Sequence, residues 1–207
     1  MKNPHVFWDK AAPKYAKKKI DNLAGYEATL ARTATYLSDQ QQVLEIGCGT
    51  GSTALLLANR VRHFTATDYS GGMIEIGARK AKDQGVTNIA FLQADVFDER
   101  LAPESFDVVM AHNLFHLLDN LPKTLERVSQ LLKPDGLLIS KTPCVGEMGP
   151  FIKMVLPVMK MMGKAPYVDT FKKSDLEAMV RDEGFEILEK GSYPEKSSSL
   201  YIVAKKG

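Results

Sequence analysis

The stretch VLEIGCGTG, residues 43–51, decides the fold, because a run of aliphatic residues leads directly into a glycine-rich turn. Gly47, Gly49 and Gly51 can adopt positive φ angles, and they leave no Cβ between the backbone and a ligand. A helix that starts after such a turn offers unpaired N–H groups to a carboxylate or a phosphate. We therefore expect a buried strand, a ligand-binding turn and a helix in immediate succession.

The turn differs from the fingerprint of dinucleotide-binding proteins. Its spacing is G-x-G-x-G, and Ser52 occupies the place of the third glycine in that fingerprint. Glu45, just before the turn, would repel a pyrophosphate. Its carboxylate could instead accept hydrogen bonds from a ligand that carries an ammonium group, or it could support the loop.

Short aliphatic or β-branched runs alternate with helical stretches from about residue 40 onward. The expected strands are 42–47, 63–68, 89–95, 106–112 and 136–142. Ser70 can cap the helix that follows it, and Lys133–Gly136 (KPDG) is expected to form a turn. This alternation predicts an α/β fold, a Rossmann-like doubly wound sheet of mostly parallel strands.

The last quarter of the chain predicts a helix and a hairpin. Ser174 and Glu177 have the spacing of a capping box, and Gly184 is expected to end that helix. The runs 185–193 and 199–206 are close enough in sequence to pair as antiparallel strands. We expect one domain over 1–207, with a helical N-terminal segment at 1–39.

Two acidic residues are expected at the carboxyl edge of the sheet. Asp68 ends the second strand, where two acceptor oxygens suit a ribose diol. Asp95 ends the third strand and can accept a hydrogen bond from an adenine amine, while Val96 and Met73 supply apolar faces for the ring. Alone, Asp68 could also be a helix cap and Asp95 a surface turn residue.

Five motifs together resemble those of class I S-adenosylmethionine-dependent methyltransferases. They are VLEIGCGTG (43–51), TATDYS (65–70), QADV (93–96), FDVVMAHNLFH (106–116) and LLKPDGLLIS (131–140). The opening residues Phe7, Trp8, Asp9, Ala12 and Tyr15 are similar to the start of small-molecule methyltransferases of the ubiquinone and menaquinone type. The resemblance implies a seven-stranded sheet with an antiparallel last strand, S-adenosyl-L-methionine as cofactor and a small-molecule acceptor.

The resemblance also implies which residues bind the cofactor. Glu45 and the glycines would contact the methionine end, Asp68 the ribose and Asp95 the adenine amine, while the end of the fourth strand would lie near the sulfonium. The full set of expected cofactor-binding residues is Tyr15, Glu45, Gly47, Cys48, Gly49, Gly51, Asp68, Tyr69, Met73, Ala94, Asp95, Val96, His112 and Asn113. Tyr15 could equally have only a packing role, and Cys48 is expected to fill the turn rather than to react.

Two histidines are candidate catalytic bases. His116 follows the fourth strand, where the transferable methyl group should point, and an ordinary imidazole can accept a proton at neutral pH. His116 could instead only pack or cap a short helix. His112 is the alternative base, closer to the end of the strand.

Residues 143–173 are expected to hold a substrate-cover insertion, whose methionine-rich part is flanked by Gly146, Gly149 and Gly163. Five of the nine methionines fall there, namely Met148, Met154, Met159, Met161 and Met162. Flexible thioethers suit an adaptable apolar pocket, although core packing and a membrane or partner surface are alternatives. Pro157 should kink or end any helix in this segment.

Composition excludes several classes of protein. The chain has 207 residues and a formal net charge of +2, so no strong field favours nucleic acid or an anionic membrane. No stretch has the length of a membrane span or of a signal peptide, which predicts a cytoplasmic protein. Cys48 and Cys144 are the only cysteines in the sequence, and no metal site is expected.

The remaining functional alternatives are an RNA or protein methyltransferase and a non-catalytic cofactor-binding module. The acceptor and the oligomeric state stay open.

Overall fold

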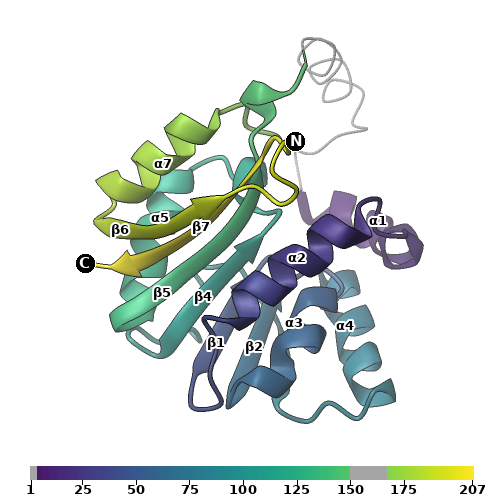
Figure 1. Cartoon of the computed structure of the whole chain (residues 1–207). Coiled ribbons are helices and arrows are strands. Elements are labelled where there is room, and N and C mark those ends of the chain that lie inside the picture. Colours follow the sequence, from purple (N-terminus) through teal and green to yellow (C-terminus); the bar gives the residue numbers. More distant parts are fainter. Residues whose placement is uncertain (1–3, 150–166) are drawn as a thin grey trace.

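The computed structural model describes residues 4–149 and 167–207, and this part of the chain contains one seven-stranded sheet (Figure 1). The strand order is β3-β2-β1-β4-β5-β7-β6. The strands are β1 Gln42–Ile46, β2 His63–Asp68, β3 Ile89–Gln93, β4 Phe106–His112, β5 Leu132–Pro143, β6 Phe185–Gly191 and β7 Ser199–Lys206. β1 to β5 pair in parallel, whereas β7 runs antiparallel between β5 and β6. The predicted fold class, including the antiparallel last strand, is confirmed.

Helices cover both faces of the sheet. They are α1 Pro4–Lys17, α2 Leu23–Ala34, α3 Ser52–Leu57, α4 Gly71–Asp83, α5 Leu121–Leu131 and α7 Lys173–Asp182, with 3-10 turns at Ala58–Arg60, Phe115–Leu117 and Val145–Glu147. α2, α3 and α4 pack on one face, and α5 and α7 pack on the other (Figure 1). This arrangement leaves the carboxyl ends of the parallel strands free for loops.

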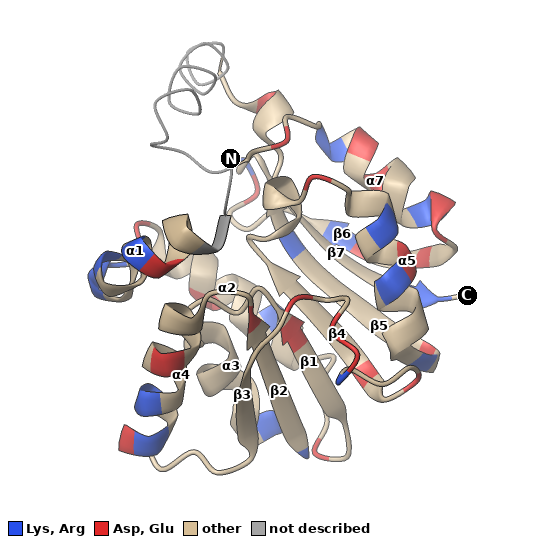
Figure 2. Ribbon diagram, turned by 180° about the vertical axis from the view of Figure 1, so that it is seen from behind, with Lys and Arg blue, Asp and Glu red and all other residues tan. Residues whose placement is uncertain are grey.

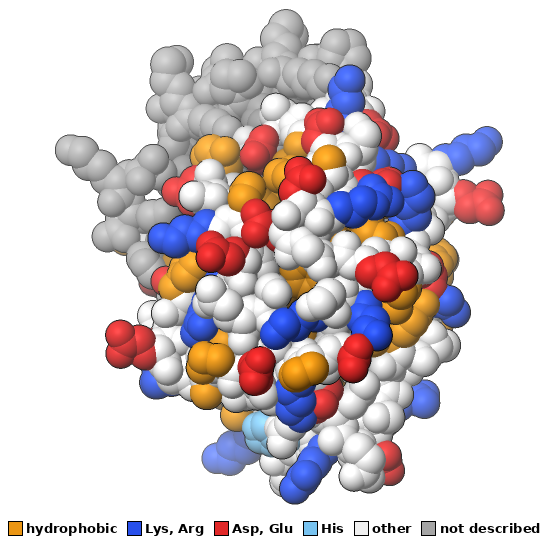
Figure 3. Space-filling view, turned by 90° about the vertical axis from the view of Figure 1, so that its left-hand side faces the viewer, with side chains coloured by type: hydrophobic (Ala, Val, Ile, Leu, Met, Phe, Trp, Pro, Cys, Tyr) orange, Lys and Arg blue, Asp and Glu red, His pale blue; other side chains and the backbone are white. Residues whose placement is uncertain are grey.

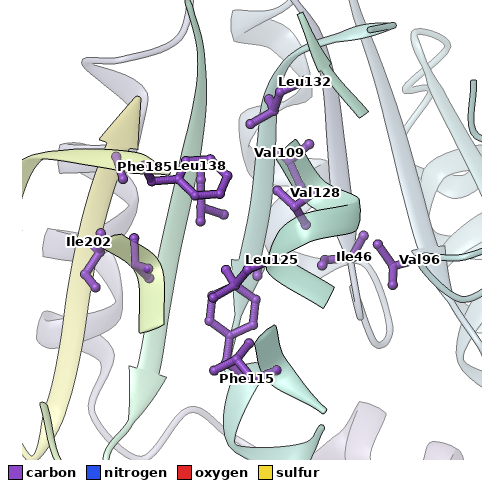
Figure 4. Close-up of a cluster of buried hydrophobic side chains, with 14 of the residues drawn as sticks. Ile46, Val96, Val109, Phe115, Leu125, Val128, Leu132, Leu138, Phe185 and Ile202 are labelled. Atoms are coloured by element: carbon purple, nitrogen blue, oxygen red, sulfur yellow. The ribbon is translucent and has the colours of Figure 1, made fainter. Parts of the chain in front are cut away.

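The larger core cluster lies between the sheet and the helices α5 and α7 (Figure 4). Leu125 and Val128, three residues apart on α5, face Val109 of β4, Leu138 of β5 and Ile202 of β7 across this layer. All five side chains are completely buried. Residues two apart on a strand point to the same face, and residues three or four apart on a helix share one face. The apolar faces that these two spacings produce pack against each other in this cluster.

Helix ends confirm two predictions and correct a third. Ser70 accepts a hydrogen bond from the N–H of Met73 at 3.2 Å, and Gly184 follows the end of α7 with a φ of +82°. The capping box predicted at Ser174 is wrong, because α7 begins earlier, at Lys173. The carboxylate that closes the cap belongs to Asp175, which accepts from the N–H of Lys172 at 2.9 Å.

The turn predicted at Lys133–Gly136 is a bulge inside β5 instead. Leu132 already pairs with Phe106 on β4, and Leu137 pairs with Val108. Five steps along β5 therefore match two steps along β4. The extra residues of β5 include Asp135, which has a φ of +61°.

The N-terminal segment forms α1 and α2, which attach to different parts of the domain. Asp9 of α1 accepts hydrogen bonds from Ser70 Oγ at 2.6 Å and from the Gly72 N–H at 3.1 Å, at the start of α4. Arg32 of α2 donates from Nε to Glu189 of β6 at 2.8 Å. The division of the chain at 1–39 and 143–173 stays a prediction. Met154, Pro157, Met159, Met161 and Met162 lie outside the described residues.

Charged side chains of both signs are mixed over the surface. Figure 2 shows basic and acidic residues interspersed along α4 and α7, and the face in Figure 3 likewise mixes acidic, basic and apolar side chains. Among the described residues, no helix is long and apolar enough to span a bilayer.

Candidate active site

A cavity of about 1110 Å³ opens at the carboxyl ends of β1, β2 and β4, the edge at which open α/β sheets bind ligands. It brings together most of the predicted cofactor-binding residues: Tyr15, Glu45, Gly47, Cys48, Gly49, Asp68, Tyr69, Met73, Ala94, Asp95, Val96, His112 and Asn113 all line it. Gly51 and His116 do not.

The glycine turn forms one wall of the cavity through its backbone. Gly47, Gly49 and Gly51 all have positive φ angles, of 63°, 55° and 72°. A Cβ added to Gly49 would lie 3.7 Å from the ring of Tyr15, so the turn and α1 enclose a narrow space. Gly51 faces away from the cavity, and a Cβ there would lie 2.5 Å from the ring of Phe91. Its role is to let α3 start next to β3.

Asp68 fixes the glycine turn and keeps free acceptor capacity. Its Oδ2 accepts from the N–H of Gly49 and its Oδ1 from the N–H of Ser70, both at 2.9 Å. Burial raises the pKa of this carboxyl, and the two backbone hydrogen bonds oppose that rise. A carboxylate can accept about four hydrogen bonds, so two sites remain, the number that a ribose diol requires.

Glu45 and His112 form a buried pair behind the turn. Their side chains are 3% and 7% exposed, and Glu45 Oε1 lies 3.5 Å from His112 Nδ1. Within the described part of the chain, Glu45 Oε2 and both ring nitrogens of His112 have no hydrogen-bond partner. A buried carboxylate oxygen without a partner is unfavourable, which suits a site that receives a hydrogen-bond donor from a ligand.

The loop after β3 forms another wall. Asp95 Oδ1 accepts from the N–H of Phe97 at 2.8 Å, which leaves the second oxygen for a ligand. Val96 and Met73 are buried, and the backbone of Ala94 donates to the Asp68 carbonyl at 3.0 Å. These residues provide the acceptor and the apolar surface that an adenine ring needs.

The two candidate bases lie in different places. His112 lines the cavity, whereas His116 lies in the 3-10 turn after β4, outside the lining. The His116 carbonyl accepts from the N–H of Asp169 at 2.7 Å, and burial lowers the pKa of its imidazole to about 4. The structure thus gives His116 a position that joins the β4 loop to the segment before α7.

Burial raises the pKa of two further side chains near the turn. Burial raises the pKa of the Cys48 thiol well above its ordinary value, so this cysteine is a poor nucleophile. Burial also raises the pKa of Tyr69 to about 12, which keeps that phenol protonated.

Several lining residues had no signal in the sequence. Tyr26 of α2 lies 3.3 Å, hydroxyl to hydroxyl, from Thr53 at the start of α3. Lys18 and Lys19 line the cavity from the α1–α2 connection, and Tyr167 lines it from the segment before α7. The docking of the N-terminal segment places Lys18, Lys19 and Tyr26, whereas the path of the chain before α7 places Tyr167, and no local motif encodes either.

Comparisons with known proteins agree with this geometry. A family model described as a methyltransferase domain matches residues 37–194. The malonyl-[acyl-carrier protein] O-methyltransferase of Paenibacillus sp. (strain JDR-2) is 29% identical over 155 residues, which are 69% of this chain and 56% of that protein. The hybrid PKS-NRPS synthetase poxE of Penicillium oxalicum is 29% identical over 145 residues, which are 65% of this chain and only 4% of that protein.

Solved structures show the same fold. The S-adenosylmethionine-dependent methyltransferase from Mesorhizobium loti superposes with a TM-score of 0.74 at 16% sequence identity, over 89% of this chain and 99% of that one. At this identity the likeness establishes the fold alone. Because the family model covers well over half of the sequence, the chain belongs to the methyltransferase domain family, and S-adenosylmethionine is the cofactor that this family implies.

Proposed function

We propose that the chain binds S-adenosylmethionine at the glycine turn and transfers its methyl group to a small-molecule acceptor in the same cavity. The observation that supports this most directly is the convergence of three unfilled features at one site. These are the Glu45 oxygen that has no hydrogen-bond partner among the described residues, the spare acceptor capacity of Asp68, and the backbone wall at Gly49.

Each residue would have a defined task toward the cofactor. Glu45 would accept from the ammonium group, Asp68 from the ribose hydroxyls and Asp95 from the adenine amine. Bound S-adenosylmethionine supplies a methyl group on a positively charged sulfur. The chain's own contribution is to hold that methyl group in line with the acceptor, and such positioning can provide roughly 7 to 11 kcal/mol of the barrier reduction.

The size and lining of the cavity support a second ligand beside the cofactor. Its volume of about 1110 Å³ exceeds the range of about 300 to 1,000 Å³ typical of a pocket for one ligand. Leu117, Leu118, Pro143 and Tyr167 give the side beyond β4 and β5 an apolar surface. This surface favours an acceptor with an apolar part.

The relatives suggest which acceptors to try first. One is named for O-methylation of a malonyl group, and others are polyketide synthases, so carboxylates and polyketide-like compounds belong in the initial screen. Phenols, quinone precursors and amines complete it. The wild-type protein is first titrated with S-adenosylhomocysteine by calorimetry and then incubated with S-adenosylmethionine and each acceptor class.

The outcomes separate the alternatives. Binding of S-adenosylhomocysteine, together with its formation from S-adenosylmethionine in the presence of a small acceptor, supports the proposal. Binding with turnover only on RNA or protein indicates a macromolecular methyltransferase, and binding without any turnover indicates a regulatory module. Absence of binding to either form of the cofactor would refute the proposed function itself.

A further inference from the structure

Lys80 on α4 makes an unusual set of hydrogen bonds to the glycine turn. Its Nζ donates to the Thr50 hydroxyl at 2.9 Å, to the Thr50 carbonyl at 3.2 Å and to the Ser52 hydroxyl at 3.3 Å. An ammonium group has three protons, so this one is fully used by the turn. Thr50 and Ser52 both line the cavity and flank Gly51 on either side.

Glycines allow α4 to lie this close to the turn. A Cβ added to Gly51 would lie 3.6 Å from the Gly77 Cα, and a Cβ on Gly77 would collide with the ring of Phe91. Lys80 is three residues after Gly77 and therefore lies on the same side of the helix, one turn further along.

No carboxylate lies within ion-pair distance of Lys80 in the described residues, which separates it from the surface lysines that pair with acids, such as Lys18 and Lys133. Burial without an acidic partner lowers its pKa. Lys80 is only partly buried, and the neutral hydrogen-bond acceptors of the turn leave its positive charge uncompensated within the described residues. A bound anion close to the turn would interact favourably with that charge.

The lining itself carries charges of both signs, with Lys18 and Lys19 from the α1–α2 connection and Lys123 from α5 beside several acids. Glu45, Asp68 and Asp95 all line the cavity, and together they would disfavour a negatively charged group. The amino-acid end of the cofactor carries both an ammonium and a carboxylate. The acidic residues favour the ammonium, and among the described residues Lys80 is the lysine whose ammonium group is hydrogen-bonded to the turn.

We infer that Lys80 is a positioning residue that holds the Thr50–Ser52 turn in place and provides, from behind it, the positive charge that favours the carboxylate of the cofactor. This inference rests on the proposed function. Lys80 itself does not line the cavity and touches no reacting atom; it acts through the turn.

The test compares two ligands that differ at the amino-acid end. S-adenosylhomocysteine carries the carboxylate, whereas 5′-methylthioadenosine lacks the entire amino-acid end. Both are titrated by calorimetry into the wild type, Lys80→Met, Lys80→Arg and the control Lys82→Met. Lys82 is an exposed lysine on the same helix, so its variant removes the same charge without touching the turn.

Lys80→Met should weaken S-adenosylhomocysteine binding about tenfold and change methylthioadenosine binding less than about twofold. Lys80→Arg, which keeps the charge and the donors, should restore much of the loss, and Lys82→Met should match the wild type. Equal losses for both ligands, or no loss, would overturn the inference. A wild type that binds neither ligand would instead refute the proposed function. Chemical denaturation of each variant shows whether a loss of binding reflects unfolding.

Discussion

Replacing Gly51 by alanine should destabilise the protein through two separable effects. Gly51 has a φ of +72°, a left-handed conformation that costs a residue with a Cβ roughly 1 to 2 kcal/mol. The new Cβ would also lie 2.5 Å from two ring atoms of Phe91, and overpacking of this kind costs about 1 to 3 kcal/mol. The expected loss in unfolding free energy is therefore about 2 to 5 kcal/mol. The unfolding free energy of a domain is about 5 to 15 kcal/mol, so a domain near the middle of that range would still fold after this loss.

A matched glycine separates backbone strain from the clash. Gly85 has a φ of +68°, and a Cβ there would meet no atom within 4 Å. Gly85→Ala should therefore lose only about 1 to 2 kcal/mol in urea denaturation. In a Phe91→Ala background the effect of Gly51→Ala should fall to the same value, because the ring is gone. If Gly51→Ala is no more destabilising than Gly85→Ala, the packing argument is incorrect.

Three further changes test other parts of the site and fold. Asp68→Ala should weaken S-adenosylhomocysteine binding by about 1.5 to 3 kcal/mol in calorimetry, and unchanged affinity would remove Asp68 from the site. His116→Asn should keep turnover within about tenfold, since its pKa of about 4 makes it a weak base at neutral pH; a hundredfold loss at unchanged cofactor affinity would instead support proton transfer. Hydrogen bonds from Arg32 lower the pKa of Glu189 from 4.5 to about 2, so the stability that this ionisation provides is present above pH 4.5 and lost as the pH falls toward 2. The stability difference between wild type and Glu189→Gln should shrink over that window in urea denaturation, and a constant difference would show that the ionisation is not coupled to folding.

The sheet and the glycine-turn side of the cavity could be predicted because the residues that specify them lie close together in the sequence. A strand that leads into glycines at 47 and 49, and acids at the ends of strands, need only the parallel arrangement of the sheet to meet at one edge. The same reasoning assigned Gly51 to the ligand, although its missing Cβ makes room for Phe91. Sequence shows that a position requires glycine, but it does not show whether a ligand or a neighbouring ring fills the space.

The remaining differences depend on contacts between distant residues. Tyr26 lines the cavity from α2, a helix that contacts β6 through the pair Arg32 and Glu189, which are 157 residues apart in sequence. His116 follows β4 as expected, yet the 3-10 turn at Phe115–Leu117 directs it away from the lining. Periodicity predicts the face of an element, but it does not predict the path of a loop after the element ends.

Glu45 offers a test in which stability and binding should change in opposite directions. Its side chain is 3% exposed, and within the described chain one of its oxygens has no hydrogen-bond partner. A buried carboxylate in this condition opposes folding, so the neutral and equally large Glu45→Gln should leave the unfolding free energy of the ligand-free protein unchanged or raise it slightly. The same change removes a charged acceptor from the ammonium group of the cofactor, which should weaken S-adenosylhomocysteine binding by about 1.5 to 3 kcal/mol. Urea denaturation and calorimetry on one preparation measure both quantities. If stability falls by more than about 2 kcal/mol while affinity holds, the main role of Glu45 is its pairing with His112, and the cofactor's ammonium group must bind elsewhere.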